Sequence, residues 1–163
     1  MKISRRVLLL LPVVSLLLAA GCREHHQSAA AAGPVLKHEH KPPHGGTPVV
    51  LGDEVYHLEL VLDAAGGKLS AYVFDGELEN FVRCADASIQ LEAVGQGPTR
   101  AITLSAVPNP ATGETVGDTS LFEGQADWLK SAREFDATLK GITIRGTTFT
   151  HVTFNFPKGN DKD

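Results

Sequence analysis

The chain contains little sulfur and few aromatic residues: 163 residues include two cysteines, one methionine and one tryptophan. Cys22 and Cys84 form no CxxC pair, and GxSxG, HExxH and P-loop motifs are also absent. The one methionine is Met1, so the thioether ligands that Cu(I) prefers are missing from the rest of the chain. These absences predict a protein that is not an enzyme, and a catalytic zinc held by three histidines is the remaining enzymatic alternative.

One long hydrophobic run is present, near the N-terminus. MKISRR is basic, and VLLLLPVVSLLLAA after it is apolar, contains Pro12 and is short for a membrane span. This layout predicts a lipoprotein signal peptide over residues 1–21. The run ends in Ala19-Ala20-Gly21-Cys22, which resembles the lipobox of bacterial lipoproteins with alanine in place of the usual leucine. The resemblance implies lipidation of Cys22, and the alternative is an ordinary signal peptide followed by a chance cysteine.

Lipidation implies a location in the bacterial cell envelope, with the chain held to the lipid bilayer by its N-terminal anchor. In Gram-negative lipoproteins an aspartate after the cysteine retains the protein in the inner membrane, but Arg23 stands there. We therefore expect anchoring in the outer membrane, facing the periplasm. Removal of Lys2, Arg5 and Arg6 leaves 12 basic against 19 acidic residues, a formal charge of −7. This charge argues against nucleic acid as a partner.

Composition divides the rest of the chain into a tether, a domain and a tail. Residues 22–46 are polar, then rich in alanine, then broken by glycine and proline, which predicts a lipidated, flexible tether that contains histidines. Residues 47–157 alternate apolar and polar residues and predict a β-sandwich domain, and residues 158–163 form a polar tail. Cys84 ends an apolar run in the domain, which predicts a buried thiol without a disulfide partner.

The domain is predicted to be all-β, an antiparallel β-sandwich or barrel-like fold of about eight strands with one short helix. Leu58 and Leu60 should face the core, while His57 and Glu59 should share the other face. The helix is expected around Gln125–Ala132, and a bulge is expected at Gly141. Hairpins are expected between residues 55–63 and 68–75, between 88–94 and 100–107, and between 133–146 and 147–156.

Residues 37–46 read KHEHKPPHGG and contain three histidines in seven positions. In an extended chain His38 and His40 project to the same side, so their imidazoles can reach one ion. Pro42-Pro43 restrict the backbone and deliver His44 after a short, stiff spacer. The pattern therefore predicts three imidazoles that converge on a metal ion.

A fourth ligand is predicted from the β domain, with His57 preferred and His151 as a weaker candidate. Imidazole suits Zn(II), Cu(II), Ni(II) and Co(II), and Zn(II) and Cu(II) are the candidate ions. The alternative is that the histidine segment is only the hydrophilic end of the tether, because histidine-rich tails bind metals weakly and often incidentally.

The stretch HKPPHGGTPVVLGDEVYHLELVLDAAGGKLSAYVFDG, with the later SLFEG and REFDATLKGITIRGTTFT, resembles a known small periplasmic β domain. That domain occurs as standalone lipoproteins and beside adaptor subunits of heavy-metal efflux pumps of the cobalt-zinc-cadmium and copper-silver type. The resemblance spans residues 38–156, and its most specific piece is PHGG followed by a strand and Tyr-His-Leu-Glu-Leu. It implies a role for His44 and His57 and, less directly, for His38 and His40. The chain lacks the adaptors' coiled-coil hairpin and lipoyl-like domain.

Two functions are therefore open. The first is an envelope lipoprotein that binds a divalent transition metal through His38, His40, His44 and His57, in metal efflux or homeostasis. An efflux adaptor or another envelope protein would be its partner. The alternative is a β-sandwich interaction module in the cell envelope that docks on another protein and has no specific metal site.

Overall fold

The computed structural model describes residues 41–94 and 97–161, all within the compact unit His38–Asp163. The predicted signal peptide, the lipidation site Cys22 and the tether up to residue 40 lie outside the described residues, and His38 and His40 lie there too. The described residues contain no helix with the length and apolar character that a membrane crossing requires.

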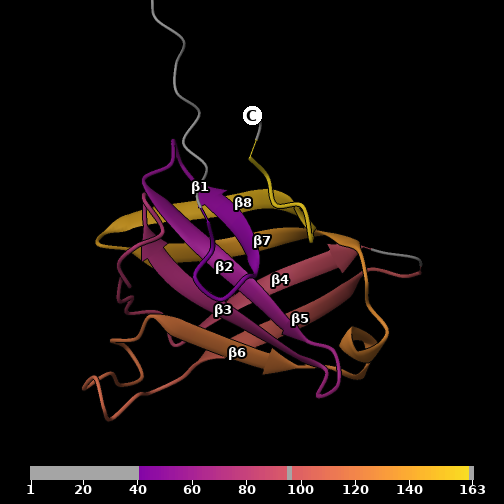
Figure 1. Ribbon diagram of the computed structural model, residues 1–163, viewed down its shortest axis with the longest axis horizontal. Coiled ribbons are helices and arrows are strands. Elements are labelled where there is room, and N and C mark those ends of the chain that lie inside the picture. Colours follow the sequence, from indigo (N-terminus) through magenta and orange to yellow (C-terminus); the bar gives the residue numbers. More distant parts are fainter. Residues whose placement is uncertain (1–40, 95–96, 162–163) are drawn as a thin grey trace, which may run out of the picture. The chain divides into compact units, whose positions relative to one another are not determined.

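The described residues form one antiparallel, nearly closed, barrel-like sheet of eight strands, which confirms the predicted all-β class (Figure 1). The order across the sheet is β1-β2-β3-β6-β5-β4-β7-β8. The predicted hairpins are present as β2–β3, β4–β5 and β7–β8. The strands are β1 (Thr47–Leu51), β2 (Tyr56–Asp63), β3 (Lys68–Asp75), β4 (Ser88–Val94), β5 (Arg100–Ala106), β6 (Leu121–Gln125), β7 (Phe135–Ile144) and β8 (Thr147–Phe156).

The segment after the long loop that follows β5 differs from its prediction. The sequence predicts a helix around Gln125–Ala132, whereas the structure has strand β6 up to Gln125 and then a single 3-10 turn, η1 (Asp127–Lys130). β6 is short, but it lies between β3 and β5 and pairs with both. This pairing gives its backbone groups partners and buries Phe122, so tertiary contacts outweigh the weak local pattern.

The β7–β8 hairpin keeps one register along its whole length. The pairs Leu139–Val152 and Ile142–Phe149 have the same offset, so the bulge predicted at Gly141 is wrong. The irregular residue is on the other strand, where His151 has a φ of 55°, in the left-handed region.

The interior of the barrel is filled by apolar side chains from every strand. On β2, Leu58 and Leu60 are fully buried in this core, which confirms the predicted inward face. His57 and Glu59 alternate with them and therefore lie on the opposite face of the strand. Both are nevertheless buried, because segments from elsewhere in the chain cover this part of the sheet.

Cys84 belongs to the core and is only 3% exposed, as the sequence predicts. Burial, followed by the charge of Asp86, raises the pKa of its thiol to about 12. The thiol therefore stays protonated at neutral pH, and a reactive thiolate is disfavoured.

Every residue of the core lies between Val49 and Phe156, so a chain that begins at Arg23 retains the whole core.

Hydrogen bonds near the C-terminus join β1 to the segment that follows β8. The Asn160 side chain accepts a bond from the Val50 backbone N–H at 2.7 Å and donates one to the Val50 carbonyl at 3.1 Å. Gly159 comes so close to β1 that an added Cβ would lie 2.3 Å from the Pro48 carbonyl oxygen. Residues 157–160 therefore cover part of the free edge of β1, where an unpaired strand would expose its backbone.

We expect the Asn160→Ala variant to lower the free energy of unfolding by about 1 to 3 kcal/mol, because both backbone groups of Val50 lose their partner. Urea unfolding followed by circular dichroism measures this change. Gln90→Ala is the matched control, since Gln90 is exposed on β4 and should change stability by less than about 0.5 kcal/mol. Equal stability of the two variants would show that Asn160 does not hold the edge of β1.

Candidate functional site

The PHGG sequence forms a tight turn that lies against β2. The Gly45 backbone N–H donates to the Pro42 carbonyl at 3.0 Å, and Gly45 has a φ of 69°. At Gly46 an added Cβ would lie 2.6 Å from the Leu60 carbonyl oxygen, so only glycine allows this approach. The two glycines therefore explain how the turn reaches the strand, although the sequence places this turn at the end of the tether.

The buried carboxylate of Glu59 holds this turn. Its side chain has no exposed surface, and its Oε1 accepts hydrogen bonds from the backbone N–H groups of His44 at 2.7 Å and Gly46 at 2.9 Å. Its Oε2 lies 2.7 Å from Nδ1 of the His44 ring. Because a carboxylate only accepts, the proton of this bond belongs to Nδ1, and in the neutral ring the lone pair then lies on Nε2.

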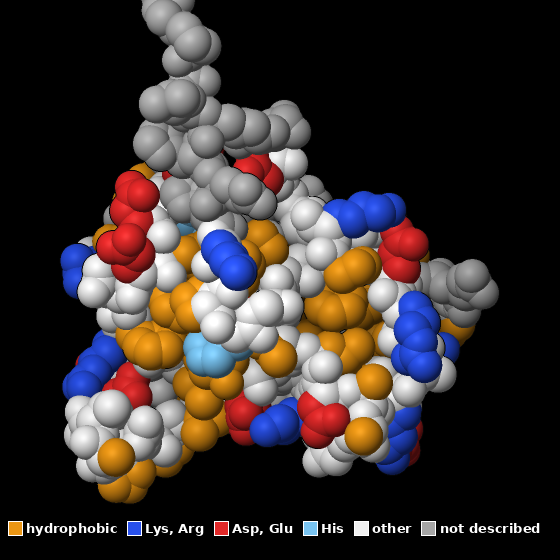
Figure 2. Space-filling view, in the orientation of Figure 1, with side chains coloured by type: hydrophobic (Ala, Val, Ile, Leu, Met, Phe, Trp, Pro, Cys, Tyr) orange, Lys and Arg blue, Asp and Glu red, His pale blue; other side chains and the backbone are white. Residues whose placement is uncertain are grey.

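Aromatic side chains fix the plane of the His44 ring. The ring stacks on Tyr72 of β3 with a centroid distance of 4.0 Å and an interplanar angle of 12°. Phe74 and Phe81 each lie 6.2 Å from it. Burial, followed by the charge of Glu123, raises the pKa of the Tyr72 phenol, which stays neutral. Figure 2 shows hydrophobic side chains next to histidine at the surface.

His57 is buried on the same face of β2 and is 1% exposed. Its Nδ1 lies 3.3 Å from the Asp75 carbonyl oxygen, and its strand neighbour on β3 is Phe74. His151 is exposed on β8, at the other end of the sheet order. Among residues 41–94 and 97–161, no three or more His, Cys, Asp or Glu side chains form a group that could hold a metal ion.

Of the predicted ligands within the described residues, the structure therefore joins His44 to the carboxylate of Glu59 and buries His57 beside the Asp75 carbonyl. The Tyr72 and Phe81 contacts to His44 were not predicted, although the strand alternation that puts Glu59 outside the core also puts Tyr72 there.

Comparisons of this chain with protein-family models, with curated proteins and with solved structures gave no match.

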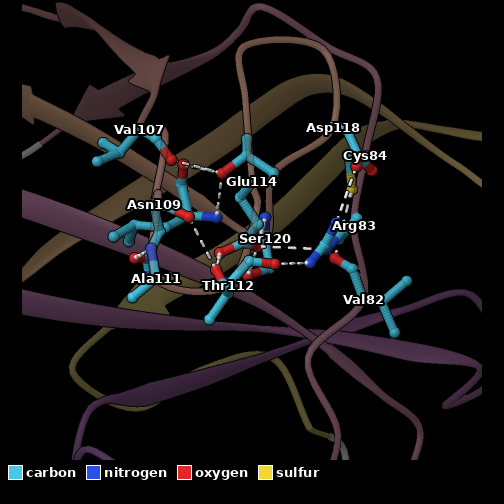
Figure 3. Close-up of polar contacts among 12 residues, drawn as sticks. Val82, Arg83, Cys84, Val107, Asn109, Ala111, Thr112, Glu114, Asp118 and Ser120 are labelled. Carbon is cyan, nitrogen blue, oxygen red and sulfur yellow. Dashed lines mark hydrogen bonds and ion pairs between the residues drawn. The ribbon is translucent and has the colours of Figure 1, made fainter.

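A second buried carboxylate, Glu114, lies in the long loop between β5 and β6 (Figure 3). Its Oε1 accepts bonds from the Ser120 backbone N–H at 2.9 Å and hydroxyl at 2.6 Å, and its Oε2 accepts one from the Thr112 hydroxyl at 2.7 Å. Arg83 then donates to Asp118 at 2.9 Å and to the Thr112 carbonyl at 2.6 Å. These bonds tie the loop to the segment that follows β3.

This second cluster has a structural role. Ser120 is 5% exposed, and its hydroxyl donates to Glu114, so it is not placed to attack a substrate. Burial alone would raise the pKa of Glu114, but the bonds from Ser120 and Thr112 and the charge of Arg83 outweigh it and hold the pKa below its usual value. The cluster therefore contributes stability in the ionised form of Glu114.

We expect Glu114→Gln to lower the free energy of unfolding at pH 7 by about 1 to 3 kcal/mol, because the amide cannot accept every bond that the carboxylate accepts. The folded pKa is lowered, so the contribution is full above the unfolded pKa of about 4.3 and is lost as pH falls through the folded pKa. The deficit should therefore shrink below about pH 4.

Urea unfolding of Glu114→Gln between pH 2.5 and pH 7 tests this dependence. Glu77→Gln is the control, since Glu77 is exposed and its removal changes the net charge equally. A deficit that is constant over the whole pH range, or one equal to that of the control, would contradict the assignment of this stability to ionised Glu114.

Proposed function

We propose that this protein is an envelope lipoprotein that binds a divalent transition metal ion, Zn(II) or Cu(II), through His44 together with His38 and His40. The observation that supports this most directly is the bond between His44 Nδ1 and the buried carboxylate of Glu59, at 2.7 Å. We propose a binding role rather than a catalytic one.

A histidine that binds a metal through one ring nitrogen commonly donates its other N–H to a carboxylate. The carboxylate fixes the tautomer and the orientation of the ring and increases the basicity of the metal-binding nitrogen. Glu59 has this relation to His44. Nδ1 faces this fully buried carboxylate, while 35% of the His44 side chain is exposed.

The stacked aromatic rings support the same role by ordering the imidazole before an ion arrives. Tyr72 covers one face of the ring at 4.0 Å, so the ring has little freedom to lose when it binds. A histidine in a flexible tail has to lose that freedom, and this difference separates His44 from an ordinary solvated tether residue.

The remaining ligands of the proposed site come from the segment just before the turn. His40 precedes His44 by four residues, a span of at most about 14 Å, so its imidazole can reach an ion bound at His44. His38 projects to the same side as His40 in an extended chain. His57 remains a weaker prediction, because at 1% exposure an ion could reach it only after the structure around it opens.

The cellular role that fits these features is metal efflux or homeostasis. The predicted lipobox at Cys22 would hold the protein at a membrane, and the resemblance of PHGG and the following strand to domains of heavy-metal efflux systems favours an adaptor as partner. The protein would then buffer the ion or deliver it to the efflux system.

A second candidate is a protein-interaction module. Phe81 is 54% exposed although it stacks on Phe74 at 4.6 Å, and an exposed aromatic side chain beside Tyr72 and His44 is a typical contact for a protein partner. In this candidate Glu59 has only the structural role of holding the turn. Metal titration separates the two candidates, because the interaction module needs no ion.

We expect a chain that begins at Arg23 to bind one Zn(II) or Cu(II) ion per molecule, more tightly than a generic polyhistidine tail, as measured by calorimetry. Replacement of His38, His40 and His44 by alanine should abolish this binding. His151→Ala is the control and should bind as the parent does. Weak binding that the triple variant retains would refute the metal site and leave the interaction module.

We expect Glu59→Gln to weaken the metal affinity by about 10- to 100-fold without unfolding the domain. The amide oxygen can still accept the two backbone N–H groups, but the amide nitrogen donates to Nδ1. The ring proton must then move to Nε2, which loses the lone pair that the metal requires. Nitrogen-15 NMR of the imidazole measures the tautomer directly.

In the parent chain, the protonated ring nitrogen of neutral His44 should be Nδ1, and in Glu59→Gln it should be Nε2. His151 serves as an internal control, because it is exposed on β8 and its ring signals should be the same in both proteins. An unchanged tautomer combined with unchanged affinity would show that Glu59 supports the turn alone. Loss of the native circular dichroism spectrum would instead identify Glu59 as essential for folding.

A further inference from the structure

A cavity of about 480 Å³ lies at one end of the barrel, and its lining includes none of the proposed metal ligands, although Ala132 and Arg133 also line a second hollow together with Gly45 and Gly46. It is lined by the end of the β4–β5 hairpin, by Trp128 of η1, and by residues that lead from η1 into β7. Its volume is within the range of small-molecule sites, about 300 to 1,000 Å³. No step of the proposed metal binding uses it.

The apolar wall of the cavity is formed by aromatic rings that hold one another in place. Trp128 meets Phe135 edge to face, with a centroid distance of 5.3 Å and an interplanar angle of 81°. Phe135 is 4% exposed and stacks on Phe156 at 5.0 Å. Trp128 itself is only partly buried, so part of its ring faces the cavity. The wall is preorganised to receive a flat or aliphatic group.

Two arginines line the same cavity. The Arg100 guanidinium lies over the Trp128 ring, 5.6 Å from its centroid, and Arg133 donates to the neighbouring Ala132 carbonyl at 3.0 Å. Within the described residues neither forms an ion pair, whereas Arg83 pairs with both Asp118 and Glu114. Stacking uses the face of a guanidinium and leaves its in-plane N–H donors available.

The one carboxylate of the lining is engaged elsewhere. Glu134 accepts a bond from Lys158 at 2.6 Å and from Asn155 at 3.3 Å, so its charge is compensated outside the cavity. In a chain with more acidic than basic residues, two arginines without carboxylate partners beside an aromatic wall are an unusual concentration of positive charge. In Figure 2, Lys and Arg side chains lie around hydrophobic surface on the side where Figure 1 shows η1.

We infer that this cavity binds an amphipathic organic anion, with a carboxylate or phosphate group between Arg100 and Arg133 and an aliphatic or aromatic body against Trp128. Guanidinium groups match the planar arrangement of a carboxylate or phosphate and form two parallel hydrogen bonds to it. The rings supply the apolar contact area that a fully hydrated anion could not use. Both halves of the ligand are therefore needed for affinity.

Trp128 is the only tryptophan in the chain, so its fluorescence reports directly on the cavity. A chain that begins at Arg23 is titrated with sodium decanoate below its micelle concentration, with decanol as the neutral analogue and with sodium acetate as the anion without a body. Calorimetry provides a second readout that is independent of the indole. We expect saturable binding of decanoate at one site, and binding at least tenfold weaker for decanol and for acetate.

By calorimetry, we expect decanoate binding to weaken about tenfold in Arg100→Gln and also in Arg133→Gln. The control is Arg145→Gln, which should bind decanoate as the parent does. Arg145 lies in the β7–β8 turn, at the far end of β7 from the cavity. Equal affinity for decanol and decanoate, or full affinity in a variant that lacks both cavity arginines, would overturn the inference.

Phosphatidylglycerol vesicles distinguish a lipid source of the anion. Vesicle binding that requires both arginines, without binding of free decanoate, would also overturn it.

Discussion

The buried carboxylate of Glu59 is the interaction on which the candidate site depends. A charge without exposed surface is costly unless hydrogen bonds compensate it, and here two backbone N–H groups and one imidazole N–H do so. The PHGG turn supplies all three donors. The turn and the carboxylate therefore need each other: the turn covers Glu59 and supplies the donors that compensate its charge, and without Glu59 the turn would have little to hold it on β2.

Glu114 shows that the same chemistry can have a different outcome elsewhere in the molecule. Both carboxylates are buried and accept several hydrogen bonds, and both attach a loop to the barrel. The donors to Glu114 are hydroxyl and backbone groups whose polar atoms are used within the loop. One donor to Glu59 is an imidazole, which has a second nitrogen at the opposite edge of its ring. That difference makes the Glu59 site a candidate for binding and the Glu114 cluster a support for the loop.

Local pattern in the sequence predicted the strands and their faces well, because alternation directly reflects the geometry of a strand. Leu58 and Leu60 were assigned to the core, and His57 and Glu59 to the other face, from period alone. β6 was not predicted, since its five residues include Gly124, carry little pattern and depend on β3 and β5 for partners. The bond between His44 and Glu59 was not predictable either, because it requires knowing that residues 15 positions apart meet across a turn.

The closure of the barrel has a consequence for the order in which the protein can fold. Val50 and Asn160 are separated by 110 positions, so the contact that covers the edge of β1 joins nearly the two ends of the domain. Contacts of such long range form late, because their loop-closure entropy is offset only after local hairpins exist. The hairpins can form first, while the outer edge of β1 stays bare until residues 157–160 reach it. These residues therefore decide how long that edge is exposed to association with other chains.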